Sequence, residues 1–93
     1  MARVRVVRKG VTAKELATVL GRRLGDGFEV ADDGSGEVIV RRSVISAAVI
    51  RINDAPGATV FRVRGVGFPL VANFGTARIV ADALRRSLEF RSV

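Results

Sequence analysis

The feature that most constrains the fold is a pair of β-branched segments on either side of Pro56-Gly57. Residues 47–52 read AAVIRI and residues 58–64 read ATVFRVR, and their alternation is typical of strands with one buried and one exposed face. Proline followed by glycine suits the central positions of a type II turn, because proline fixes φ and glycine accepts a positive φ. The sequence therefore predicts a β-hairpin in the middle of the chain.

The same alternation predicts how the two strands pair. We expect Ile50 to lie opposite Phe61, which gives the hairpin one apolar face and one face that carries arginine. A slip of one residue would expose Phe61 and bury an arginine, so the two faces are strongly specified. The flanking pairs expected on the apolar face are Ile52 with Thr59 and Ala48 with Val63.

Regular elements are also predicted on both sides of the hairpin. Residues 3–8 alternate as a strand, and Thr12 with Glu15 has the spacing of a capping box, which predicts a helix that stops at Gly25 or Gly27. Residues 28–31 and 37–41 predict a second hairpin around a turn-rich loop. For residues 42–46 two alternatives stay open, a direct bend into the central hairpin or a short helix over residues 43–49.

The C-terminal part predicts a break followed by a second amphipathic helix. Glycines and a proline in residues 65–71 indicate irregular structure that packs on the core, and Asn73 is a candidate N-cap for a helix over residues 74–90. The order β-α-β-β-β-β-α predicts one α+β domain over residues 1–93. We expect a two-layer sandwich, with a mostly antiparallel sheet and both helices on its apolar face.

Composition excludes several classes of function. The chain has no cysteine and no histidine, which removes thiolate chemistry, the usual metal ligand and the usual general base. No pair of carboxylates is recognisably placed for acid–base work, and the acidic loop does not match the calcium pattern of an EF-hand. We expect no enzyme, no cofactor, no metal and no small-molecule substrate.

Localisation follows from what the chain lacks. The longest apolar run, residues 47–50, is far too short to cross a membrane, and no apolar segment of signal-peptide type follows the basic start. We therefore expect a cytoplasmic protein with no membrane partner.

Charge supplies the two candidate sites. The net charge is +7, and arginine recurs at outward positions of the predicted sheet. The candidate interaction or anion-binding face consists of Arg3, Arg5, Val49, Arg51, Val60, Arg62 and Arg64. Residues 26–37 contain five acids and no lysine or arginine, which predicts an acidic hairpin tip made of Asp26, Glu29, Asp32, Asp33 and Glu37. Solvated charge that serves only solubility is the plain alternative for both.

These features predict a protein that works by contact. Valine mixed with arginine suits an interface, where arginine is enriched, and we expect a protein-interaction or assembly module that forms homo-oligomers or binds another protein. An acidic tip meeting a basic face would be a heterologous contact, which closes into a ring or grows as a filament. The alternative is a nucleic-acid-binding module in which the arginines contact phosphates, although an RNA-recognition sheet would normally also expose aromatic rings.

Overall fold

The computed structural model describes residues 2–32, 34–43, 46–67 and 70–86. Along the chain the elements are β1 (Ala2–Val6), α1 (Ala13–Leu24), β2 (Glu29–Asp32), β3 (Glu37–Arg41), β4 (Ser46–Ala55), β5 (Ala58–Gly67) and α2 (Leu70–Arg86). The strands form one antiparallel sheet in the order β1-β5-β4-β3-β2. The predicted α+β class and the order of elements are confirmed.

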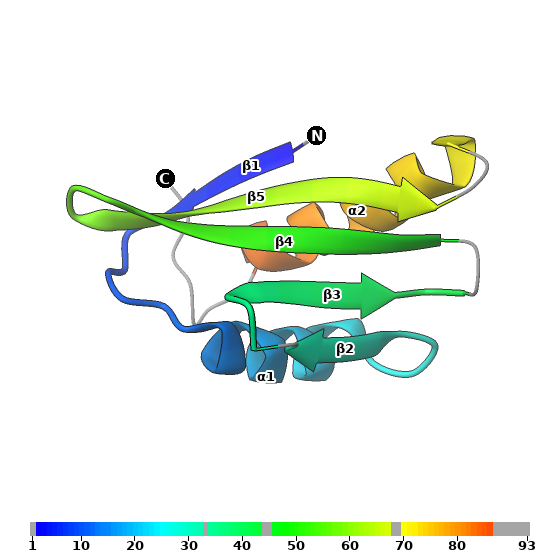
Figure 1. Ribbon diagram of the computed structural model, residues 1–93, viewed down its shortest axis with the longest axis horizontal. Helices are drawn as coiled ribbons and strands as arrows, with labels where there is room; N and C mark the ends of the chain where they lie inside the picture. The colour runs from blue at the N-terminus through cyan, green and yellow to red at the C-terminus, as the bar shows by residue number, and fades with distance from the viewer. Residues whose placement is uncertain (1, 33, 44–45, 68–69, 87–93) are drawn as a thin grey trace.

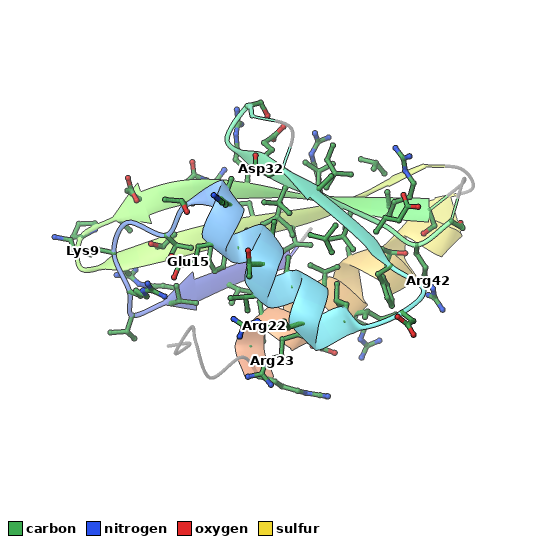
Figure 2. The ribbon with its side chains drawn as sticks, turned by 90° about the horizontal axis from the view of Figure 1, so that it is seen from below. Lys9, Glu15, Arg22, Arg23, Asp32 and Arg42 are labelled. Carbon is green, nitrogen blue, oxygen red and sulfur yellow. The ribbon has the colours of Figure 1, made fainter. Side chains whose placement is uncertain are left out.

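Both helices pack on the same side of the sheet, with α1 next to β2 and β3 and α2 behind β4 and β5 (Figure 1). The side view in Figure 2 shows the two layers, with no helix on the other side of the sheet among the described residues. The layer between helices and sheet holds a single cluster of buried side chains. Its largest members are Phe61, Leu16, Leu20, Ile50 and Leu84.

The central hairpin is formed by β4 and β5, and its two faces are as predicted. Phe61 and Ile50 are fully buried, whereas Arg62 and Arg51 are exposed. The predicted pairing is wrong by two residues, because Ile50 pairs with Val63 and Ile52 pairs with Phe61.

The shape of the turn explains this shift in register. Ala55 pairs directly with Ala58, so the loop consists of Pro56 and Gly57 alone, and Gly57 has a φ of 70°. Continued to the turn, the predicted register would have paired Asp54 with Gly57 and placed Ala55 and Pro56 in the loop instead. A shift of two residues keeps every side chain on its predicted face, because the side-chain period of a strand is two.

Helix α1 begins at the predicted cap. The Thr12 Oγ1 accepts a hydrogen bond from the Glu15 backbone N at 3.1 Å, and Gly25 caps the C-terminal end at a φ of 69°. The Glu15 carboxylate pairs with the Arg8 guanidinium at 2.5 Å, and the Thr59 hydroxyl donates to the Arg8 carbonyl oxygen at 2.5 Å. These contacts hold the connection from β1 to α1 against Thr59, at the start of β5.

Of the two alternatives left open for residues 42–46, the helix over residues 43–49 is excluded, because β4 begins at Ser46 and pairs with β3 and β5 on its two sides. Two predicted boundaries are wrong. Residues 65–67 belong to β5, where Gly65 pairs with Ala48, so the backbone ladder overrides the weak strand preference of glycine. Helix α2 begins at Leu70 and already contains Asn73, which is therefore not its cap. The predicted end of this helix, residues 87–90, lies outside the described residues.

Candidate interaction surface

The side of the sheet opposite the helices is the candidate surface, and we call it the outer face. Strand alternation and the register define its members among the described residues. They are Arg3 and Arg5 of β1, Glu29 and Ala31 of β2, Glu37, Ile39 and Arg41 of β3, Ala47, Val49, Arg51 and Asn53 of β4, and Val60, Arg62, Arg64 and Val66 of β5.

The structure brings the predicted basic face together as one surface. All seven residues predicted for it, Arg3, Arg5, Val49, Arg51, Val60, Arg62 and Arg64, lie on the outer face. The five arginines among them are exposed, and the two valines are half-buried. The register between β1 and β5 completes the surface, because it places Arg3 directly opposite Arg62.

A row of like charges crosses the outer face. Arg3 pairs with Arg62, Arg62 pairs with Arg51, and Arg51 pairs with Glu37, so three arginines stand side by side with one carboxylate at the end of the row. Directly opposed residues on neighbouring strands have Cβ atoms about 5 Å apart, and like charges in such pairs are destabilising. The sheet therefore holds a charge pattern that does not favour its own folding.

Carboxylates within the chain neutralise little of this row. The Arg51 Nε lies 4.0 Å from the Glu37 Oε2, while Arg3 and Arg62 form no ion pair with any carboxylate of the described residues. A hollow of about 400 Å³ opens between these side chains, lined by Glu37, Arg51, Arg62 and Arg64. The guanidinium groups around this hollow can accept an anionic group from outside the chain.

Aliphatic side chains lie beside the arginine row. Val49 pairs with Ile39 on one side and with Arg64 on the other, and Val60 lies next to Arg5. Val49, Ile39 and Val60 are all half-buried although no element of the described ranges covers them. No described residue of the outer face is aromatic, since Phe61 is buried in the core and Phe28 precedes β2. The surface combines apolar contact area with arginine, and it lacks rings on which bases could stack.

The predicted acidic tip is divided in the structure. Glu29 and Glu37 lie on the outer face itself, Glu29 opposite Arg41 and Glu37 opposite Arg51. Asp26 is exposed in the loop after α1, and Asp33 lies outside the described residues. Asp32 ends β2, where its carboxylate accepts a hydrogen bond from the Gly34 backbone N at 3.0 Å, and it pairs with the buried Val38, so strand alternation does not place it on the outer face. Acid and base thus share one surface at opposite edges of the sheet.

Sequence reasoning missed the part of the outer face that comes from β3. Ile39 and Arg41 lie on this face, because they alternate along β3 with the buried Val38 and Val40. The signal was present as the alternation of residues 37–41. These residues extend the surface from the arginine edge to the acidic edge.

Other candidate features in the described residues are weaker. A hollow of about 390 Å³ between α1 and α2 has Leu24, Phe28 and Ile79 on its walls, and it mixes Asp82 with Arg23 and Arg86, so its charge selects no ligand of either sign. No three metal-ligating side chains of His, Cys, Asp or Glu type converge within the described ranges. In the same ranges neither helix combines the length and the apolar character that crossing a membrane requires.

Comparison with known proteins leaves the outer face as the main guide to function. The chain matches no protein-family model, no curated protein and no solved structure.

Proposed function

We propose that this protein is a non-enzymatic interaction module of the cytoplasm that associates with copies of itself through the outer face. The observation that carries the proposal is a sheet face free of helices among the described residues, on which half-buried aliphatic residues lie beside arginines of which Arg3 and Arg62 form no ion pair with a described carboxylate. Apolar side chains with arginine around them are the composition of a protein interface.

Size supports association as well. A chain of 93 residues removes only about 60–65% of its unfolded surface from water, so its own core provides a modest margin of stability. A second copy on the outer face would bury Ile39, Val49 and Val60, and each Å² of apolar surface removed from water contributes roughly 25 cal/mol. A self-complementary surface also needs acid to match its arginines, and Glu29 and Glu37 supply it on the same face.

Light scattering across a concentration series tests the proposal. We expect the molar mass to rise from that of a monomer to that of a dimer with increasing concentration. Val49→Glu, which places a carboxylate among the aliphatic residues of the outer face, should weaken association at least tenfold, because the charge would have to be desolvated in the interface. Thr18→Glu is the matched control, because it adds the same charge on an exposed position of α1 and should leave association unchanged. A monomer at every concentration would contradict the proposal.

Binding of nucleic acid is the second candidate function, and the arginine row with its hollow is the observation that favours it. Contacts of arginine with phosphates release counterions, so such binding falls steeply as salt increases. Titration of random DNA and RNA at several salt concentrations separates the two functions. We expect the self-associating protein to show no strong salt-dependent binding. Salt-dependent binding that disappears in Arg62→Glu/Arg64→Glu but persists in Arg78→Glu would favour nucleic acid instead.

A further inference from the structure

The charge of the outer face changes from one edge of the sheet to the other. β1 and β5 each present two arginines, β4 presents one, β3 presents one arginine and one glutamate, and β2 presents one glutamate. Since the strand order is β1-β5-β4-β3-β2, the formal charge decreases at every step after β5. The outer face therefore has a basic edge and an acidic edge, with a charge gradient perpendicular to its strands.

This gradient determines how two copies can face each other. Two sheets that pack with aligned strands are related either by a two-fold axis parallel to the strands or by one perpendicular to them in the plane of the interface. The parallel axis places β1 and β5 of one copy over β2 and β3 of the other. The perpendicular axis places β1 over β1 and β5 over β5, which opposes arginine with arginine along the whole basic edge.

Resting on the proposed self-association, we infer that the protein forms a closed dimer, face to face, about a two-fold axis that runs parallel to β4. The contact is isologous, because arginine and glutamate both lie on the one surface that each copy contributes. It replaces the heterologous contact of an acidic tip with a basic face, since Glu29 and Glu37 are part of the outer face.

The arginine row identifies the central pair of this dimer. Arg51 lies on the middle strand β4, Arg62 lies one strand to one side and Glu37 one strand to the other. Rotation about β4 brings Glu37 of each copy over Arg62 of the second copy, so the dimer contains this pair twice. Within one chain the two residues are separated by β4, at two strand spacings or about 10 Å.

The next row supplies the apolar contact. Val49 lies on β4 one row from Arg51 and meets Val49 of the second copy near the axis, with Ile39 beside it on β3. One like-charge contact remains, because Arg51 lies on the axis and faces Arg51 of the second copy. Within each chain the Glu37 Oε2 lies 4.0 Å from the Arg51 Nε, so each of these two guanidinium groups has a carboxylate beside it. In the same arrangement Arg64 faces Ile39 of the second copy and Arg41 faces Val66, so the pair of Glu37 with Arg62 is the charge-complementary contact that decides the orientation.

Charge reversal at the central pair tests the orientation. Glu37→Arg alone and Arg62→Glu alone should each weaken self-association at least tenfold, because each variant places two like-charged pairs in its own dimer. An equimolar mixture of the two variants should recover dimers, because each of the two sites in the mixed dimer brings one arginine over one glutamate. One site combines the two introduced side chains, and the other combines the native Arg62 with the native Glu37. Native mass spectrometry distinguishes the mixed dimer from both homodimers by mass.

Controls separate a loss of association from a loss of folding. The double variant Glu37→Arg/Arg62→Glu should dimerise by itself, and it provides the test if Glu37→Arg alone does not fold. Arg78→Glu mixed with Glu37→Arg should form no more mixed dimer than wild type mixed with Glu37→Arg, because Arg78 is an exposed residue of α2 on the helix side of the sheet. Circular dichroism of each variant confirms the fold.

The outcomes distinguish the orientation from the underlying function. A wild-type protein that is a monomer at every concentration overturns the self-association itself. A wild-type dimer whose two variants show no recovery on mixing overturns only the parallel axis. Preferential dimers of wild type with Arg62→Glu would indicate the perpendicular axis, in which Arg62 faces Arg62, and growth beyond a dimer would indicate a heterologous contact.

Discussion

Phe61→Ala should lower the free energy of unfolding by about 3–5 kcal/mol, the range for truncation of a buried phenylalanine. Phe61 is fully buried on the central part of the sheet, between Val4 on β1 and Ile52 on β4. Domains of this size are stable by only about 5–15 kcal/mol, so the variant would be largely unfolded at moderate denaturant concentrations.

Urea denaturation followed by circular dichroism measures this loss. Val60→Ala is the control, because Val60 is the neighbouring residue on the outer face and is only half-buried. Measured in dilute solution, where we expect a monomer, this control should cost less than about 1 kcal/mol. Similar losses in the two variants would show that the two faces of β5 do not differ as described.

Arg62→Glu should have opposite effects on the isolated chain and on its association. Arg62 stands between Arg3 and Arg51 in the row of like charges, and reversing its charge converts two repulsive cross-strand pairs into attractive ones. Each such pair changes stability by roughly 0.2–1 kcal/mol, so the monomer should gain about 0.5–2 kcal/mol. The proposed dimer should weaken at least tenfold, because in it the introduced carboxylate would face the like charge of Glu37 on the second copy.

The two effects are measured on the same samples. Denaturation in dilute solution reports the monomer, and sedimentation over a concentration series reports association. Arg78→Glu adds the same charge change on α2 and should alter association by less than twofold. A variant that is less stable than wild type in dilute solution would contradict the argument that the row costs folding energy.

A pattern such as this row of arginines, which weakens the folded chain, is expected where function requires it.

The sequence predicted both faces of the central hairpin, because burial of Phe61 and exposure of Arg62 depend only on alternation along one strand. The predicted register was wrong, because it did not leave Pro56 and Gly57 alone in the loop as the pairing of Ala55 with Ala58 does. It placed Asn73 at a helix start through a local preference for capping, whereas α2 is helical from Leu70 onwards.

The candidate surface shows the same division between local and long-range information. Alternation identified Arg3, Arg51 and Arg62 as outward-facing residues. Their assembly into one row requires β1 to pair with β5. These are the first and the last strand along the chain, and the residue pattern of neither strand indicates which strand it pairs with. The position of Glu37 at the end of that row likewise depends on the pairing of β3 with β4.

The pairing of the first strand with the last also has a consequence for synthesis of the protein. Val4 leaves the ribosome early, yet its partner Phe61 on β5 follows only after most of the chain has been made. Until then β1 has no strand to pair with, and the sheet can close only after a long stretch of intervening chain is brought into a loop. Contacts of such large sequence separation slow folding, so we expect closure of β1 onto β5 to be a late event for the newly made chain.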